Sequence, residues 1–180
     1  MRVIAGKCRS LQLKTPKGEH TRPTLDRIKE TLFNIIQRDI PGCVFADVFA
    51  GSGGIGIEAL SRGARKAYFI DNSSEAINCI RENIAFTKLE NESTVLKGDA
   101  LSCLYDIHDE HVDIIFFDPP YDLGIEEKIF SILYSMKNID SDTLVILESS
   151  LDKEFSFDGF ELVRCKEYKT NKHGFYRRIK

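Results

Sequence analysis

The tetrapeptide Asp118-Pro119-Pro120-Tyr121 has the residue types that could hold a flat molecule bearing an amine. It follows the apolar run 112–117, which is typical of a strand buried on both faces of a parallel sheet. Proline lacks the N–H that a sheet needs, so the chain must leave at the carboxyl edge, where open α/β sheets bind ligands. Asp-Pro is also ordinary turn chemistry. The preceding strand and the following tyrosine nevertheless favour a binding site, in which carboxylate and carbonyl oxygens accept from the amine and the ring stacks.

A glycine-rich segment follows an earlier apolar run and has the pattern of a nucleoside-binding turn. Gly51, Gly53 and Gly56 come directly after the strand predicted at 43–49. Asp71 lies about twenty residues beyond, where an acidic residue binds ribose hydroxyls in dinucleotide-binding proteins. Glycines also make tight strand-to-helix turns, so the pattern alone is a weak signal. Together with its position and Asp71, it predicts a bound nucleoside.

Two further carboxylates bear on which nucleoside is bound. Asp47 lies in the strand just before the glycines, where it would repel a pyrophosphate and attract a cationic or amine-bearing group. S-adenosylmethionine carries a sulfonium, an amino group and ribose hydroxyls but no phosphate, so Asp47 favours it over NAD. Asp99 ends the third predicted strand and could accept from an adenine amino group. Capping of the helix that follows is an equally good interpretation of Asp99.

The segments around these residues alternate between strand and helix patterns. Seven segments have the apolar pattern of strands: 43–49, 66–71, 93–97, 112–117, 142–148, 160–168 and 174–179. Helical spacing separates the first five, and the last two have no helix between them. This order predicts an α/β fold with a mostly parallel, doubly wound, seven-stranded sheet and an antiparallel C-terminal hairpin.

The N-terminal segment stands outside this alternation. Residues 3–6 and 11–14 have the pattern of two short strands around a polar turn, which predicts a small basic β-hairpin. An amphipathic helix follows, and Thr24 is its expected N-cap. The length suits one domain with a full core. We therefore expect a single domain over 1–180, made of a hairpin extension (1–22) and an α/β core (23–180).

Charge is distributed unevenly along the chain, whose net charge is −3. Residues 1–29 and residues 164–180 each have a balance of +6, and the segment between them has −15. Two basic ends could bind a polyanion such as RNA, although solvated charged termini are an equally good explanation. Arg22 and Arg27 lie beside the start of the first helix, where phosphate binds readily. An Arg–Asp structural brace is at least as good an interpretation of these two arginines.

The composition argues against several classes of protein. No apolar run approaches the ~18 residues of a membrane span, and the N-terminus lacks the apolar core of a secretory signal. The five cysteines are widely spaced, which argues against a disulfide framework or a zinc site and fits a reducing cytoplasm. His108 and His111 are interpreted as parts of a solvated loop rather than metal ligands. His173 lies in the basic tail and could contact RNA, although a surface histidine is the better interpretation.

Longer motifs resemble a known family. The segment 47–63 (DVFAGSGGIGIEALSRG) and the tetrapeptide at 118–121 are similar to the methyltransferases that modify the exocyclic N2 amine of one guanine in bacterial 16S ribosomal RNA. The segment 22–34 (RPTLDRIKETLFN) is similar to an N-terminal signature of that family, which general methyltransferases lack. The resemblance spans nearly the whole chain and is loosest between 123 and 180.

The resemblance implies a Rossmann-like class I methyltransferase fold that binds S-adenosylmethionine. Asp47 and the glycine loop would face the amino-acid end of the cofactor, Asp71 its ribose and Asp99 its adenine. The residues expected near the cofactor are Asp47, Phe49, Gly51, Ser52, Gly53, Gly56, Asp71, Asn72, Asp99 and Ala100.

The resemblance also implies catalytic roles for the residues of the tetrapeptide: Asp118, Pro119, Pro120 and Tyr121. Tyr121 would stack on a flipped-out guanine, while the Asp118 carboxylate and the Pro119 carbonyl accept from its N2 amine. The expected substrate is 16S rRNA within a 30S particle or assembly intermediate. We expect a cytoplasmic, monomeric protein that needs no metal. RNA contacts are expected from the basic residues Arg2, Lys7, Arg9, Arg22 and Arg27.

Three other functions compete with this one. The first is an amino-methyltransferase that acts on N6 of adenine in DNA, or on an amine of another RNA, since enzymes acting on DNA adenine share the tetrapeptide. The 22–34 signature and the lack of a separate DNA-reading domain count against it. A non-catalytic RNA-binding module for ribosome assembly would not need Asp47, Asp118 and Tyr121. A nicotinamide-dependent oxidoreductase is third, and Asp47 disfavours it.

Overall fold

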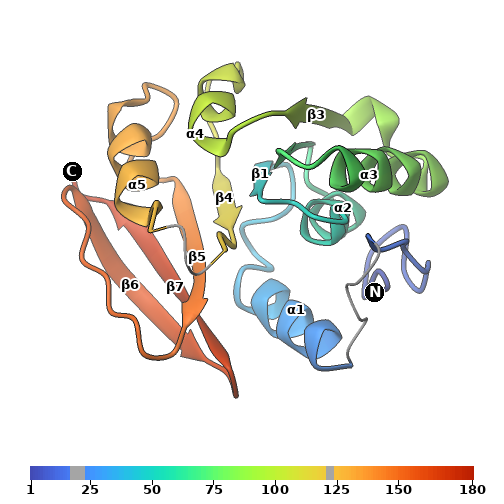
Figure 1. The fold of residues 1–180 in the computed structure, drawn as a ribbon, viewed down its shortest axis with the longest axis horizontal. Helices are drawn as coiled ribbons and strands as arrows, with labels where there is room; N and C mark the ends of the chain where they lie inside the picture. The colour runs from blue at the N-terminus through green and yellow to red at the C-terminus, as the bar shows by residue number, and fades with distance from the viewer. Residues whose placement is uncertain (17–22, 121–123) are drawn as a thin grey trace.

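The computed structural model describes residues 1–16, 23–120 and 124–180, with the side chains of 23–25 left aside (Figure 1). Seven strands form one sheet in the order β3-β2-β1-β4-β5-β7-β6. The parallel strands are β1 (Val44–Val48), β2 (Lys66–Asp71), β3 (Ser93–Lys97), β4 (Ile114–Phe117) and β5 (Leu144–Ser150). β7 (Asn171–Arg178) runs antiparallel to β5 and to the edge strand β6 (Phe160–Glu167). The predicted parallel sheet with an antiparallel C-terminal pair is confirmed.

The helices connect these strands as the apolar spacing predicts. They are α1 (Pro23–Ile35), α2 (Gly54–Ser61), α3 (Ser74–Thr87), α4 (Ala100–Cys103) and α5 (Glu126–Ser135), with single 3-10 turns η1 (Glu90–Glu92) and η2 (Leu104–Asp106). The Ser73 side chain caps α3 by accepting from the Ala76 N–H at 3.4 Å. α1 begins at Pro23, one residue before the expected cap Thr24, because proline suits a first helical position that needs no N–H partner.

Two apolar clusters cover the two faces of the sheet, and alternate strand residues belong to each. Phe45, Phe116 and Ile146 pack with residues of α1, α2 and α3 in one cluster. Phe117 and Leu147 pack with α4 and α5 in the other. Successive side chains of a strand point to opposite faces, so this division identifies the face of each residue near the strand ends. Within the described residues, no helix is both long and apolar enough to span a bilayer.

The N-terminal hairpin is reduced to a single antiparallel bridge between Arg2 and Gln12. Backbone hydrogen bonds still join the two predicted segments, from Val3 N–H to the Leu11 carbonyl and from Leu13 N–H to the Met1 carbonyl, but the strands predicted at 3–6 and 11–14 do not extend further because the next N–H groups bond to α2 instead. Glu58 accepts hydrogen bonds from the Ile4 N–H at 2.7 Å and the Ala5 N–H at 3.0 Å. The Ile4 and Ala5 N–H groups, which a longer hairpin would pair across strands, are therefore satisfied by a side chain of α2.

Glu58 anchors this segment from a position with no solvent exposure. Its carboxylate also accepts from Arg62 Nε at 2.7 Å and lies 3.4 Å from Lys29 Nζ. Lys29 donates to the Arg2 carbonyl at 2.6 Å, and burial lowers the pKa of its ammonium, while the charge of Glu58 opposes that shift. A buried carboxylate is tolerated only with such partners. The network joins the N-terminal segment to α1 and α2.

Candidate active site

The acidic residues predicted from four separate segments lie along one edge of the sheet. Strands β3, β2, β1 and β4 are neighbours and parallel, so their carboxyl ends meet at the same edge. Asp99 follows β3, Asp71 ends β2, Asp47 lies near the end of β1 and Asp118 follows β4. The order of the strands therefore places Asp99, Asp71, Asp47 and Asp118 in that sequence along the edge.

Asp47 is a buried carboxyl group at the start of the glycine loop, with an exposed fraction of 2%. Its Oδ2 accepts from the Gly56 backbone N–H at 2.8 Å. Burial raises its pKa to about 7; the Gly56 hydrogen bond opposes this shift and the nearby charge of Asp71 adds to it. A positive ligand group beside Asp47 would favour its charged form.

The glycine loop makes a sharp turn from β1 into α2. Gly51 and Gly53 have φ of 55° and 76°, values in the left-handed region that favours glycine, and Phe49 has a φ of 65°. At Gly56 a Cβ would overlap the ring of Phe69 on β2, so a glycine lets α2 approach the sheet closely. The tight turn that the sequence suggested is present, and the structure adds the close packing of α2 against β2.

Asp71 is oriented by two backbone groups. Its Oδ2 accepts from the Gly51 N–H at 2.9 Å and its Oδ1 from the Ser73 N–H at 2.8 Å. A carboxylate oxygen has a second lone pair, so each can also accept from a ribose hydroxyl. Asn72 follows Asp71 and is exposed at the same edge.

Asp99 caps α4, which was one of its two interpretations. Its Oδ2 accepts from the Ser102 N–H at 3.1 Å and from the Ser102 hydroxyl at 3.3 Å. Asp99 is exposed, and a contact with an adenine amino group stays a prediction. Ala100, the first residue of α4, is buried. Ser52 is buried within the glycine loop, and its carbonyl accepts from the Asn83 side chain at 2.9 Å.

The chain leaves the sheet after Phe117, as the prolines require. Asp118 and Pro120 are exposed, and Pro119 is buried. The register pairs Asp47 with Phe116, two residues before Asp118. Tyr121 lies outside the described residues, so its predicted stacking role stays a prediction.

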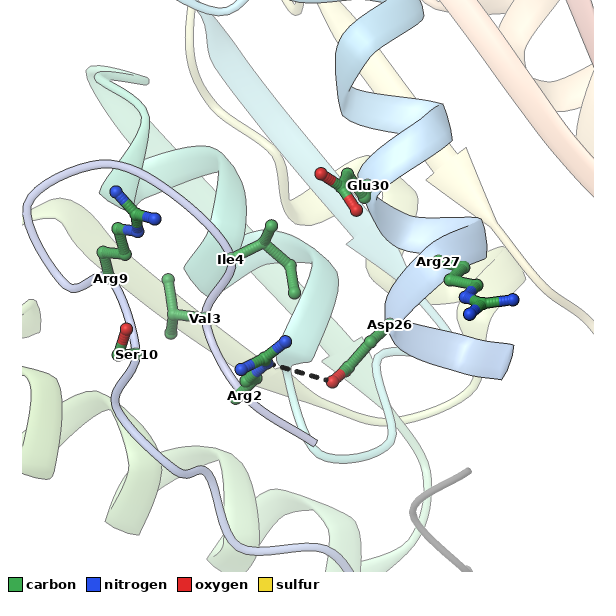
Figure 2. Close-up of a pocket in the computed structure, with 8 residues that line it drawn as sticks. All are labelled: Arg2, Val3, Ile4, Arg9, Ser10, Asp26, Arg27 and Glu30. Atoms are coloured by element: carbon green, nitrogen blue, oxygen red, sulfur yellow. Dashed lines mark ion pairs between the residues drawn. The ribbon is translucent and has the colours of Figure 1, made fainter. Parts of the chain in front are cut away.

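Three of the predicted RNA-binding arginines surround one cavity. Arg2, Arg9 and Arg27 line it together with Asp26 and Glu30, between the N-terminal segment and α1, and its volume is about 460 Å³ (Figure 2). Figure 2 shows Arg2 and Asp26 pointing toward each other, with 3.3 Å between Nε and Oδ2. The Arg–Asp brace is thus present, but it uses Arg2.

The other two predicted RNA-binding residues lie elsewhere. Lys7 pairs with Glu92 at 2.8 Å on the surface, and Arg22 lies outside the described residues. Figure 1 shows the N-terminal segment beside α1 and α2, whereas the basic β6–β7 pair forms the opposite end of the sheet.

The interpretation of His173 as a surface residue is wrong, because its exposed fraction is 0%. β7 lies between β5 and β6, and the His173 ring packs edge-on against the rings of Phe116 and Tyr168. His173 Nε2 lies 2.9 Å from Glu148 Oε2, and Nδ1 lies 3.1 Å from the Tyr168 hydroxyl. Glu148 was missed in the sequence, although it follows an apolar run just as Asp71 and Asp118 do. His108 is exposed and His111 half-exposed, in the predicted loop.

The fold and the acidic edge define the class of the protein as a class I methyltransferase. The structure titled "Putative methyltransferase yhhF from Escherichia coli" is similar, with a TM-score of 0.84 and 30% identity, over 99% of this chain and 97% of that one. The chain belongs to the family described as Conserved hypothetical protein 95, whose model matches residues 1–177. The resemblance to a methyltransferase family seen in the motifs is confirmed, and the guanine N2 specificity that it implies stays a prediction.

Two relatives of this chain are named as rRNA methyltransferases. "Putative rRNA methyltransferase YlbH" of Bacillus subtilis is 34% identical over 169 residues, which is 93% of this chain and 92% of that protein. "Ribosomal RNA small subunit methyltransferase D" of Haemophilus influenzae is 35% identical over 155 residues, 85% of this chain and 80% of that protein. Family and fold imply S-adenosylmethionine as methyl donor. A buried carboxyl at Asp47 suits its cationic end, and the oriented oxygens of Asp71 suit its ribose.

Proposed function

We propose that the protein methylates the exocyclic N2 amine of one guanine in 16S ribosomal RNA. The observation that carries this proposal is the position of Asp118-Pro119-Pro120 at the carboxyl edge, next to β1 with its buried Asp47. The names of the relatives support ribosomal RNA as the substrate class. We extend the proposal to a cytoplasmic monomer that acts on a 30S particle or assembly intermediate and uses no metal.

S-adenosylmethionine, when bound, supplies an electrophilic methyl group on a sulfonium. In our proposal Asp47 and the glycine loop hold its amino-acid end, Asp71 accepts from its ribose hydroxyls, and Asp99 accepts from its adenine amine. The raised pKa of Asp47 supports this role, because a neighbouring cation restores the charge of a carboxyl that burial otherwise keeps partly neutral. The remaining residues of the proposed cofactor site are Phe49, Ser52, Asn72 and Ala100.

The residues after β4 act on the amine. A guanine amine is a poor nucleophile because its lone pair is delocalised into the ring. Acceptors at the Asp118 carboxylate and the Pro119 carbonyl would hold the nitrogen pyramidal and make its lone pair available. They would also stabilise the positive charge that grows on nitrogen, so positioning and electrostatics supply most of the rate. Tyr121 is the proposed stacking partner of the flipped-out base.

The basic residues of the N-terminal segment and α1 are proposed to bind the RNA backbone. Arg9 and Arg27 are exposed at the cavity of Figure 2 and can contact phosphates. Arg2 and Lys7 are engaged in ion pairs, but exposed pairs are weak and can exchange a carboxylate for a phosphate. Arg22 is the fifth proposed contact. Because the acidic edge carries no excess of positive charge, these residues supply much of the affinity for a polyanion.

The test compares methyl acceptors side by side. Purified protein is incubated with tritiated S-adenosylmethionine and 16S rRNA, 30S particles or duplex DNA, and the labelled nucleoside is identified by chromatography. We expect N2-methylguanosine from RNA or particles. Label in N6-methyladenine would instead support an adenine amino-methyltransferase, which shares the Asp-Pro-Pro-Tyr tetrapeptide. No transfer to any acceptor, with rRNA binding intact, would support a non-catalytic assembly module. Comparing rRNA from cells with and without the gene then identifies the methylated nucleotide.

A further inference from the structure

A second carboxylate, Glu148, lies at the edge of the sheet at the level where Asp118 leaves it. Phe117 on β4 pairs with Leu147 on β5 in the parallel register, and Asp118 and Glu148 are the next residues of the two chains. β4 ends at Phe117, whereas β5 continues to Ser150. Glu148 is therefore held within a strand that extends past the point where its neighbour has left the sheet.

Glu148 faces the same side of the sheet as Asp47. Side chains alternate along a strand, and Ile146, two residues before Glu148, packs in the cluster that contains Phe45. Phe45 is two residues before Asp47 on β1. The cofactor carboxyl at Asp47 and the carboxylate at Glu148 thus lie on one face, separated by β4.

Two side chains of β7 hold the Glu148 carboxylate, and one from the turn before β7 holds the second of them. The Asn171 amide nitrogen donates to Oε1, and His173 Nε2 lies 2.9 Å from Oε2. The hydroxyl of Tyr168 lies 3.1 Å from His173 Nδ1. Burial, with a smaller contribution from the charge of Glu148, raises the pKa of Tyr168 to about 12, so this hydroxyl keeps its proton and can donate to Nδ1. A donor at Nδ1 leaves the Nε2 proton to be donated to Glu148.

The hydrogen bond from Asn171 to Glu148 leaves the other polar atom of the Asn171 amide without a partner among the described residues. That atom is Oδ1, and Asn171 has an exposed fraction of 6%. Leaving a buried oxygen unpaired is unfavourable, and it follows from turning the amide N–H toward Glu148. The Glu148 side chain retains 15% exposure while His173 retains 1%. The Glu148 carboxylate is thus more accessible to a ligand than the His173 ring that orients it.

The chemistry of a second carboxylate at this edge distinguishes purines. Guanine presents two donors side by side, the N1–H and the N2 amine, whereas adenine places an unprotonated N1 beside its amine. A site built to accept from a donor strongly rejects an analogue that lacks it. We propose that Glu148, oriented by His173, Tyr168 and Asn171, accepts a hydrogen bond from N1–H of the target base and so selects guanine. This inference rests on the proposed function, in which Asp118 accepts from the N2 amine.

The test uses 2-aminopurine, which keeps the reactive amine but has an unprotonated N1. After the target nucleotide has been mapped, 30S particles are reconstituted with 16S rRNA that carries guanine or 2-aminopurine at that position. For the wild-type protein we expect kcat/KM to be lower on 2-aminopurine on the order of 100-fold. Glu148→Gln should reduce this ratio to about tenfold or less, because an amide can donate to N1. Glu161→Gln, at an exposed position on β6, is the matched control and should keep the wild-type ratio.

The ratio is measured with one enzyme preparation, so partial unfolding lowers both rates and leaves it unchanged. An unchanged preference for guanine in Glu148→Gln would overturn the inference, as would a folded variant that binds S-adenosylmethionine and methylates neither base. If Glu148→Gln does not fold, the variant Tyr168→Phe provides the test. Tyr168→Phe removes the hydroxyl that orients His173 and should reduce the preference for guanine severalfold. An unaltered preference in this variant would overturn the inference. Failure of the wild-type protein to methylate the guanine would instead contradict the proposed function itself.

Discussion

The Asp47 carboxyl accepts a hydrogen bond from the backbone N–H of Gly56 at 2.8 Å, which joins the end of β1 to the first turn of α2. The bond crosses the base of the glycine loop, so the loop closes over a carboxyl that is fully buried. A group of this kind is oriented before any ligand binds. Both the free-energy cost of burying Asp47 and its attraction for a cationic ligand depend on whether the carboxyl is charged.

Asp47→Asn should stabilise the ligand-free protein at pH 8 and have little effect at pH 4. The pKa of Asp47 is raised from 3.8 to about 7 by burial. Between these values the folded protein binds a proton that the unfolded chain has released, so the free energy of unfolding falls as pH rises from about 4 to 7. Above pH 7 the charged carboxylate is buried at a cost of roughly 2–4 kcal/mol, which the amide removes. Chemical denaturation at both pH values measures the difference.

The same substitution should weaken S-adenosylmethionine binding by at least about tenfold, because the favourable charge on Asp47 is lost. Isothermal calorimetry at pH 8 measures this effect. Asp158→Asn, at an exposed position before β6, serves as the control. Equal destabilisation of Asp47→Asn at both pH values would show that packing rather than charge determines the cost.

Asp118→Ala should abolish methyl transfer while leaving cofactor binding largely intact. The residue is exposed after the end of β4, so its removal should disturb the core little. Loss of an acceptor that acts as charge develops lowers kcat by at least about 100-fold. Single-turnover assays with tritiated S-adenosylmethionine, together with calorimetry, separate chemistry from binding. Near-normal transfer would remove Asp118 from the catalytic role.

Glu58→Ala should release the N-terminal segment and destabilise the fold. It removes the acceptor of the Ile4 and Ala5 N–H groups and leaves Lys29 buried without its carboxylate. Breaking a buried ion pair by deleting one partner costs about 3–5 kcal/mol. Hydrogen exchange of residues 3–8 should become faster than that of β1. Glu82→Ala, which breaks an exposed pair with Lys14, should change neither quantity appreciably. Unaltered exchange in the Glu58 variant would mean that other contacts hold the segment.

Replacing Arg9 and Arg27 together with Gln should weaken RNA binding without changing S-adenosylmethionine affinity. Both line the cavity of Figure 2 at the N-terminal segment and α1. Each lost phosphate contact reduces the magnitude of the slope of log K against log salt by about 1. The slope of the double variant should therefore be smaller in magnitude by about 2 than that of the wild-type protein. Filter binding of a 16S rRNA fragment over a range of salt concentrations provides the slope. Arg81→Gln on α3, which is also exposed, is the control. An identical slope for the double variant would place the RNA contacts elsewhere.

Sequence patterns were informative wherever the physics is local. Apolar runs, glycines and prolines predicted the strands and the points where the chain leaves them, because backbone conformation and side-chain periodicity depend on near neighbours. The parallel order then required Asp47, Asp71 and Asp118 to meet at one edge. Capping by Asp99 could also be predicted from the sequence, since an N-cap contacts only the first turn of the helix that follows it.

His173 shows where sequence patterns fail. Its neighbours in sequence are basic, and they predicted a solvated tail. Its burial follows instead from β7 lying between β5 and β6, which brings it against Glu148, 25 residues away along the chain. The N-terminal strands are also shorter than predicted because of a distant residue. Glu58 on α2 accepts from the N–H groups of Ile4 and Ala5, which the predicted hairpin would have used.

The sequence by itself determined the α/β order, the carboxyl-edge position of the acidic residues and the family. Tertiary structure alone decided which polar groups are covered and what partners they meet, because burial and long-range hydrogen bonds depend on segments far apart in the chain. The buried state of Asp47 and the Glu148–His173 pair are of this second kind. Both follow from packing between segments that are far apart in the sequence, so no short stretch of residues reveals them.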